Sequence, residues 1–438
     1  MSGFNRIKRF ALLVLLVCLF SGVISIIHEQ IRESRQDKVV LRFAVTSRTS
    51  VYDETDTALT NYFKQVYRYA DSNSYKKVDA FIINGNVTGD GSKEAFDSVN
   101  SLAKTWLLSG TRFYTTRADG DFIVGDEGEQ TAADPYIQEK LEDQVVRING
   151  YTFIFMTPYY NYYEPKLDWL EQTLERVTKY SEKPVFVFQF DALKDTYYGT
   201  ESWYAIESEN IMNIIEKYPV AVDFSSSSST ASNTMRSVFQ RNASYVNTGV
   251  VSNLRMNFYE FGHDTYSEVI HAGNEGVSQC KIVEVYGSGK VEILTMDLNT
   301  GNLYKMPDSD DTLIFTLYPG QKHLYGYTKE DFVSVDQPCF DENAEVSFEK
   351  NENGETVMTF DNAHDKDGML FYKIVVSDRV GTSVKETCTY ADFSQWEVPE
   401  RENVSLGVLE NGKYRVEIIP YDIFGTQGMA KTVSFLSE

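Results

Sequence analysis

Short apolar runs alternate with segments of helical periodicity along the first half of the chain. Residues 39–46 and 78–84 are predicted to form buried strands, because β-branched and aromatic side chains fill most of both runs. Residues 53–70 between them, and 92–108 after them, carry apolar side chains at the i, i+3, i+4 and i+7 positions of one helical face. Alternating strands and helices of this kind indicate an α/β domain whose sheet has helices on both faces.

The same alternation continues to about residue 224. Further strands are predicted at 112–116, 151–156, 185–190 and 220–224, and further helices begin at Pro165 and cover Ile211 to Ile215. The run at 185–190 follows a proline and is too short for a helix, so it is typical of a strand buried on both faces. The polar residues after it, up to Gly199, are expected at the rim of the sheet, where ligands of open α/β sheets usually bind.

From Tyr245 onward the pattern changes to β-strands only. A hairpin that turns at 287–289 is predicted to complete the first domain, which we expect to span residues 39–304. Residues 305–340 form a polar connector with several prolines and glycines. Residues 341–438 begin with a predicted hairpin around the turn N-E-N-G, and their strand spacing is typical of a β-sandwich of about 100 residues.

The N-terminal segment predicts a membrane anchor. Residues 10–27 carry no charge, and as a helix of ~27 Å they would just cross a hydrocarbon core of roughly 30 Å. Basic residues in the tail 1–9 place that tail in the cytoplasm and the bulk of the chain outside, beyond a linker at 28–38. A cleaved signal peptide is the alternative. No small-residue cleavage site follows, so we expect a retained signal anchor and a single-pass transmembrane topology.

The net charge limits the possible classes of partner, and the cysteine content limits the possible disulfides. The formal net charge is −23, which argues against nucleic acid as a partner and suits an extracellular domain that stays soluble. Cys18 lies in the apolar segment, which leaves Cys280, Cys339 and Cys388 without C-x-x-C spacing. A Cys339–Cys388 disulfide and buried free thiols are both compatible with this pattern.

Motifs at the ends of the predicted strands resemble those of one enzyme family. They are F-A-V-T-S-R-T-S (43–50), G-N-V-T-G-D-G (85–91), the segment 183–199 and F-S-S-S-S-S-T (224–230). Their order and surroundings are similar to the metal-binding stations of the calcineurin-like metallophosphoesterases, and the resemblance covers residues 40–300. It implies a four-layer α/β/β/α sandwich in which two divalent metals, bound by carboxylates and imidazoles, activate a water. Residues 412–425 resemble the late strands of a fibronectin type III or Ig-like module.

The residue types that would bind the metals are replaced at every station. The resemblance places the substituted positions at Arg48, Ser50, Asn86, Ala118, Asp119, Phe190, Ser227 and Ser229. The chain has five histidines, of which only His263 and His271 lie within the domain, and neither falls at a station. Arg48 carries a permanent positive charge that would repel a cation. We therefore expect no metal and no other cofactor, although the family would use two divalent ions.

These substitutions predict a pseudoenzyme that acts in binding or scaffolding at the cell surface. The sequence contains no G-x-S-x-G elbow, Walker loop, H-E-x-x-H motif or dinucleotide fingerprint. None of these motifs therefore indicates another catalytic activity. The partner would be a cell-surface ligand or protein of unknown identity, in addition to the membrane.

Two alternatives remain open at this point. One is an active phosphoesterase with a rebuilt site, such as a single cation held by oxygen ligands near Asn86, Asp119 and Asp191. The other is a metal-free receptor for a phospho-ligand or glycan. The candidate ligand-binding residues of that receptor are Arg48, Asp191, Lys194, Tyr197 and Tyr198.

Aromatic residues cluster in the predicted rim loops. The clusters are Tyr159–Tyr163, Tyr197–Tyr198 and Trp203–Tyr204. Flat amphipathic rings suit stacking on sugar or peptide ligands, but packing of one loop against another explains them equally well.

Overall fold

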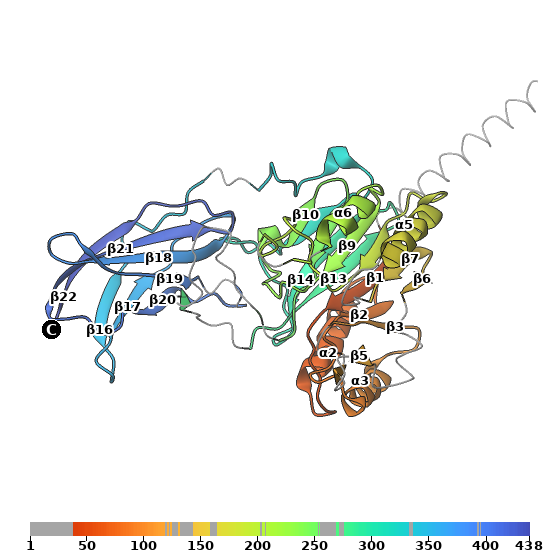
Figure 1. The fold of residues 1–438 in the computed structure, drawn as a ribbon, viewed down its shortest axis with the longest axis horizontal. Coiled ribbons are helices and arrows are strands. Elements are labelled where there is room, and N and C mark those ends of the chain that lie inside the picture. The colour runs from red at the N-terminus through yellow and green to blue at the C-terminus, as the bar shows by residue number, and fades with distance from the viewer. Residues whose placement is uncertain are drawn as a thin grey trace, which may run out of the picture.

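A computed structural model describes most of the chain beyond the N-terminal segment. The described residues are 38–118, 121, 123–124, 130–131, 143–157, 164–201, 204–205, 207–252, 254, 269–270, 276–332, 336–391, 394 and 396–438. The predicted anchor at 10–27 lies outside them. Within them, no helix combines the length and the apolar character that crossing a bilayer requires. The chain forms a mixed α/β part and an elongated β part beside it (Figure 1), so the predicted α/β class with a following β domain is confirmed.

The first sheet of the α/β part has the strand order β15-β14-β13-β1-β2-β3. Its strands are β1 (Val39–Thr46), β2 (Ala80–Asn84), β3 (Arg112–Thr116), β13 (Gln279–Tyr286), β14 (Val291–Asp297) and β15 (Ile314–Leu317). Strands β1, β2 and β3 are parallel, whereas β13, β14 and β15 run antiparallel to their neighbours. Strand β15 lies inside the segment that we expected to be a connector. The first domain therefore extends past Tyr304, because Phe315 and Leu317 are fully buried in its core.

A second sheet has the order β10-β11-β9-β8-β7-β6. Its strands are β6 (Gln144–Ile148), β7 (Tyr151–Phe155), β8 (Val185–Phe188), β9 (Ala221–Ser225), β10 (Val238–Gln240) and β11 (Ser244–Asn247). The central strands are parallel, and β6 and β10 are antiparallel edge strands. Two short strands, β4 (Ile123–Val124) and β5 (Gln130–Thr131), pair separately.

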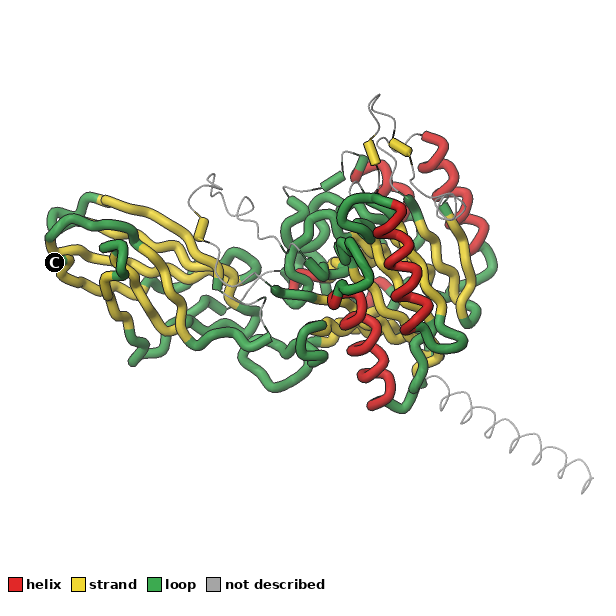
Figure 2. The backbone as a smooth tube through the Cα atoms, turned by 90° about the horizontal axis from the view of Figure 1, so that it is seen from below, coloured by secondary structure: helices red, strands yellow, loops and turns green. Residues whose placement is uncertain are grey.

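The two sheets lie face to face between two pairs of helices. Helices α2 (Thr57–Ser72) and α3 (Lys93–Trp106) pack on the outer face of the first sheet, and α5 (Glu164–Thr178) and α6 (Ser208–Ile215) on that of the second. Between the sheets, Phe43 of β1 meets Phe153 of β7 and Phe186 of β8 edge to face, with ring centroids 5.0–5.1 Å apart. The layers are thus helix, sheet, sheet and helix. All of these helices belong to this part of the molecule (Figure 2).

The β part consists of two smaller sheets around their own core. Three strands, β16 (Val346–Lys350), β17 (Thr356–Asp361) and β20 (Arg401–Ser405), form one sheet. The other sheet contains β18 (Met369–Ser377), β19 (Ser383–Tyr390), β21 (Gly412–Asp422), β22 (Lys431–Ser437) and the short β12 (Val269–Ile270). The predicted hairpin at the start of this part is confirmed as the antiparallel pair β16–β17. Buried residues from both sheets, among them Phe360, Ile374 and Val416, form the core.

The two parts meet in a packed junction. Tyr198, which follows β8, is buried in an apolar cluster with Leu370, Phe371 and Ile423 of the β part. The hydroxyl of Tyr304, after β14, donates a hydrogen bond of 2.9 Å to the carbonyl oxygen of Ser394. Contacts of this kind fix how the β part sits on the α/β part. No disulfide joins Cys339 and Cys388, which are exposed and buried respectively.

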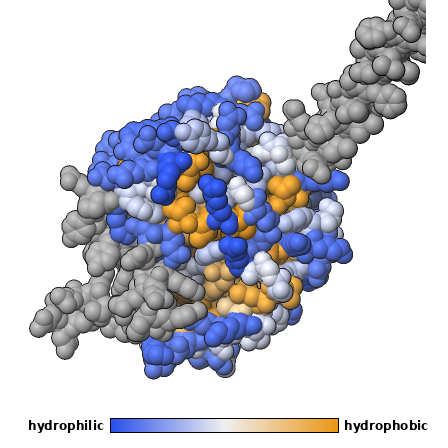
Figure 3. Space-filling model, turned by 90° about the vertical axis from the view of Figure 1, so that its right-hand side faces the viewer, coloured by the Kyte–Doolittle hydropathy of each residue, from blue (hydrophilic) through white to orange (hydrophobic). Residues whose placement is uncertain are grey.

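The end of the α/β part that faces away from the β part has a mainly hydrophilic surface. The hydrophobic residues there form small patches separated by hydrophilic side chains (Figure 3). The described portion of this face thus presents only interrupted apolar surface.

Candidate functional site

The strand ends bring most of the predicted stations together. The backbone N–H of Arg48 donates to the carbonyl oxygen of Gly85 at 3.0 Å, and that of Ser50 donates to Asn86 at 3.1 Å. The N–H groups of Ser226 and Ser227 donate to the carbonyl oxygen of Phe190 at 3.0 and 2.9 Å. The four loops after β1, β2, β8 and β9 are therefore in contact, as the resemblance implied. We call the described residues of these four loops, together with those of the loop after β3, the strand-end cluster. Asp119, which belongs to the loop after β3, lies outside the described residues.

The backbone turns sharply in this cluster. Arg48, Ser50, Asn86 and Ser229 have φ angles of 51°, 47°, 50° and 56°. Residues other than glycine adopt this left-handed conformation infrequently, and it persists where the surrounding contacts hold it in place. Here those contacts are the hydrogen bonds between loops. The left-handed residues turn the loops after β1, β2 and β9 within four residues of the strand end.

A phenylalanine ring fills the middle of the strand-end cluster. Phe190 is only 5% exposed. A Cβ atom added to Gly85 would lie 2.3 Å from Phe190 Cδ2 and 3.0 Å from the Cβ atom of Ala118. The guanidinium carbon of Arg48 lies 5.5 Å from the centroid of the same ring, within cation–π range. An apolar ring and a fixed cation thus lie at the position that the resemblance assigns to metal ligands.

The side chains of the cluster do not fit a pair of divalent cations. Such a pair needs several carboxylate or imidazole ligands. Asp121 is fully buried, but its oxygens accept the N–H groups of Thr88 and Ala118 at 2.8 and 3.1 Å, and burial raises the pKa of its carboxyl group. The Ser227 hydroxyl accepts the N–H of Ala192 at 2.7 Å. The described residues of the cluster therefore use their oxygens to hold the loops together.

The prediction that Tyr197 and Tyr198 present rings to a ligand is wrong. Both side chains are fully buried. The Tyr197 hydroxyl shares a hydrogen bond of 3.0 Å with Ser225 Oγ, and burial raises the pKa of the phenol. Tyr198 packs in the junction between the two parts. The alternative interpretation, packing of loops against each other, accounts for both residues.

Lys194 and Asp191 remain near the surface of the same loop. The ammonium group of Lys194 lies 5.0 Å from the ring centroid of Tyr204, and Asp191 is half-buried. The aromatic residues Tyr159–Tyr163 and Trp203 lie outside the described residues. In the described part of this loop, Lys194 therefore contacts an aromatic side chain of the protein itself.

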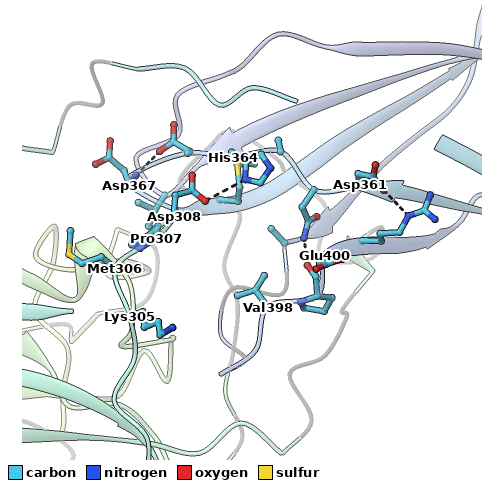
Figure 4. A pocket seen from close by; sticks show the side chains of 18 of the residues that line it. Lys305, Met306, Pro307, Asp308, Asp361, His364, Asp367, Val398 and Glu400 are labelled. Atoms are coloured by element: carbon cyan, nitrogen blue, oxygen red, sulfur yellow. Dashed lines mark hydrogen bonds and ion pairs between the residues drawn. The ribbon is translucent and has the colours of Figure 1, made fainter. Parts of the chain in front are cut away.

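A cavity of about 650 Å³ lies at the junction of the two parts. Its walls come from the loop before β10, the segment after β14, and the loops around β17, β18 and β20. Figure 4 shows Met306 and Pro307 on one side of it and Val398 and Glu400 on the other, with Asp308 and His364 next to one another. Trp396 also lines the cavity and packs edge to face on Tyr304, with ring centroids 5.9 Å apart. The volume lies within the range of small-molecule sites, ~300–1,000 Å³. We call it the junction pocket.

The junction pocket is acidic. Its carboxylates are those of Asp308, Asp341, Asp361, Asp365, Asp367 and Glu400, and its basic side chains are those of Lys305, His364 and Arg401. Arg401 Nε forms an ion pair with Asp361 Oδ1 at 2.8 Å, which neutralises one carboxylate. His364 Nδ1 lies 3.4 Å from Asp308 Oδ1, a contact drawn in Figure 4. The surplus of negative charge disfavours phosphate esters and other anions here.

The sequence analysis missed the junction pocket. Its residues come from both parts of the chain, so no single motif contains them. One local signal was present: the segment D-K-D-G at 365–368 has the alternating aspartates and glycine that are common in oxygen-ligand loops.

Comparisons with known proteins find similar solved structures but no matching family. No protein-family model and no curated protein matches the chain. Among solved structures, a purple acid phosphatase from yellow lupin (Lupinus luteus) seeds is similar at 10% identity and a TM-score of 0.40, over 63% of this chain and 53% of that one. A family 2 glycosyl hydrolase from Bacteroides cellulosilyticus aligns at 7% identity and a TM-score of 0.21, over 91% of this chain and 62% of that one. The chain thus spans between half and two thirds of each of these proteins.

Proposed function

We propose that the chain is a metallophosphoesterase-like protein without a dimetal centre, and that it binds a ligand at the junction pocket. The calcineurin-like assignment is supported by the helix, sheet, sheet and helix layers and by the convergence of the loops after β1, β2, β8 and β9. The single observation that carries the proposal is the buried ring of Phe190, which lies against Gly85 in the middle of the strand-end cluster. The apolar segment 10–27 would hold the protein at a membrane.

The absence of hydrolysis is tested with the purified full-length chain. We expect no turnover of a chromogenic phosphodiester with added Mn²⁺, and no near-stoichiometric manganese, iron or zinc by elemental analysis. The physical reason is that a phenyl ring and a guanidinium cannot replace anionic or imidazole ligands. Turnover that a chelator abolishes would show that a metal centre is present after all and would overturn this half of the proposal.

The ligand class follows from the walls of the junction pocket. Carboxylates accept hydrogen bonds from hydroxyl groups, and the Trp396 ring offers a flat apolar face. A neutral polyhydroxyl ligand of the carbohydrate class satisfies both, whereas a phosphate ester would meet the surplus of negative charge. The proposal therefore favours glycan binding over phospho-ligand binding.

Binding is measured by retention of the full-length chain on immobilised glycans and peptidoglycan. We expect retention by the wild type and at least a fivefold loss of affinity for Trp396→Ala, since stacking on an aromatic side chain contributes ~1–3 kcal/mol for nucleic-acid bases. Tyr180→Ala is the matched control, because Tyr180 is 88% exposed and lies outside the junction pocket. Equal retention of the Trp396 and Tyr180 variants would place the binding surface elsewhere.

A further inference from the structure

Three aspartates converge beside the junction pocket, and two of them, Asp365 and Asp367, line its wall. Asp365 and Asp367 lie in the loop between β17 and β18, and Asp422 ends β21. Strands β18 and β21 pair with Met369 opposite Asp422, which brings the loop next to the strand end. One carboxylate oxygen from each of the three residues lies within 4.8 Å of the other two. The close approach of three like charges is unfavourable unless something compensates them.

Asp365 provides a second, independent indication of a ligand. It is only 6% exposed. Its Oδ1 atom accepts the N–H of Asp367 at 2.8 Å, but its buried Oδ2 atom accepts no hydrogen bond from the described residues. Leaving a buried carboxylate oxygen without a partner is costly, so such atoms in proteins usually face an ion, a water or a ligand. Burial, with Asp422 and Asp367 nearby, raises the pKa of Asp365 to about 6.

The basic side chains nearby are directed to other carboxylates. Lys366, within the same loop, forms an ion pair with Asp336. His364 contacts Asp308 and Asp341, at 3.4 and 3.7 Å. None of these three ion pairs includes a carboxylate of the three-aspartate group. The charge of Lys366 still acts on Asp365 and Asp367, so this neighbour compensates their charge only in part.

We propose that Asp365, Asp367 and Asp422 bind a calcium ion. Calcium takes oxygen ligands at ~2.3–2.6 Å, so two ligands on opposite sides of one ion are separated by at most about 5 Å. The observed separation, within 4.8 Å, meets this limit. Magnesium demands near-ideal octahedral geometry and usually keeps several of its waters, so a group of carboxylates from two loops suits calcium better.

The ion would stiffen the junction between the two parts of the molecule. Gly368, which follows Asp367, lies against Pro307 of the α/β part, since a Cβ atom added to it would be 3.1 Å from Pro307 Cγ. Ile423, which follows Asp422, accepts a hydrogen bond of 3.4 Å from Arg236 Nη1. Both segments of the calcium site are thus next to residues that contact the other part. Calcium would fix the shape of the junction pocket from its β-part wall.

Calcium binding is tested on the chelator-stripped full-length chain by thermal unfolding and terbium luminescence. We expect a saturable rise in the unfolding midpoint as calcium is titrated to about 10 mM, the range needed for weak oxygen-ligand sites. Calcium should also displace Tb³⁺, and magnesium should do so at least tenfold less effectively. The double variant Asp365→Asn/Asp367→Asn should lose at least tenfold in calcium affinity.

Two further measurements keep the test independent of misfolding. Without calcium, the Asp365→Asn/Asp367→Asn variant should unfold at a midpoint no lower than the wild type, because the change removes repulsion between carboxylates. Glu349→Gln/Glu352→Gln is the matched control; it changes the net charge equally at exposed positions of the β part and should bind calcium as the wild type does. The proposal is overturned by a wild-type midpoint that calcium does not move, by unchanged affinity in the aspartate variant, or by equal effects of magnesium and calcium.

Discussion

Replacing Phe190 by alanine is expected to lower the free energy of unfolding by about 3–5 kcal/mol. The ring is 5% exposed and lies against Gly85 in the strand-end cluster. Its removal would leave a cavity that the neighbours cannot close. Gly85 has no side chain, and the backbone hydrogen bonds from Arg48 and Ser226 hold the surrounding loops in place. Urea unfolding of the full-length variant, followed by far-UV circular dichroism, measures the loss.

A conservative variant separates packing from any other role of this residue. Phe190→Leu keeps most of the volume and should lose less than about 1.5 kcal/mol. Tyr180→Ala, at a residue 88% exposed, should change stability by no more than about 0.5 kcal/mol. If Phe190→Ala were as stable as the Tyr180 variant, Phe190 would not be a core residue and the filled strand-end cluster would lose its main support.

The strands and helices of the α/β part could be predicted because each has a strong local pattern. Predicted strand 112–116 coincides with β3 (Arg112–Thr116), and predicted strand 39–46 with β1. Both are segments whose β-branched and aromatic content decides the conformation without help from the rest of the chain. The helical face over 53–70 likewise appears as α2, whose buried residues include Leu59, Phe63 and Val66.

Elements with weak local patterns were missed for a physical reason. Strand β15 has only four residues, and the periodicity of so short a segment is ambiguous; pairing with β14 decides its conformation. Tyr198 illustrates the same limit for a single residue. Its polar neighbours in the segment after β8 favoured an exposed loop, but contacts with Leu370 and Phe371, more than 170 residues further along the chain, bury it.

One part of the candidate site could be predicted from the sequence, and the other part could not. The strand-end cluster was predictable because its residues lie at the end of a predicted strand or directly after one, and parallel strands bring their ends to one edge of a sheet. The junction pocket was not, since it depends on how the β part docks onto the α/β part, where Trp396 of the β part packs on Tyr304. Local patterns thus give the elements and the ends of the strands, whereas docking of one part on another requires the structure.

The second substitution with a large expected effect on stability breaks a buried ion pair in the first sheet. Replacing Glu284 by alanine should lower the free energy of unfolding by about 3–5 kcal/mol, because it leaves a buried guanidinium without its counter-charge. Arg42 of β1 is 1% exposed and lies directly opposite Glu284 of β13. Its Nε and Nη2 atoms contact Glu284 Oε1 at 2.7 and 2.6 Å, beneath Tyr69 of α2.

Two variants show whether burial of the charge is the cause. Glu284→Gln keeps an acceptor oxygen for Arg42 and should lose less stability than Glu284→Ala, whereas Glu171→Ala removes an exposed partner of Lys217 and should change little. Urea unfolding of the three variants under identical conditions ranks them. If Glu284→Ala and Glu171→Ala were equally mild, water would reach Arg42 in the folded protein.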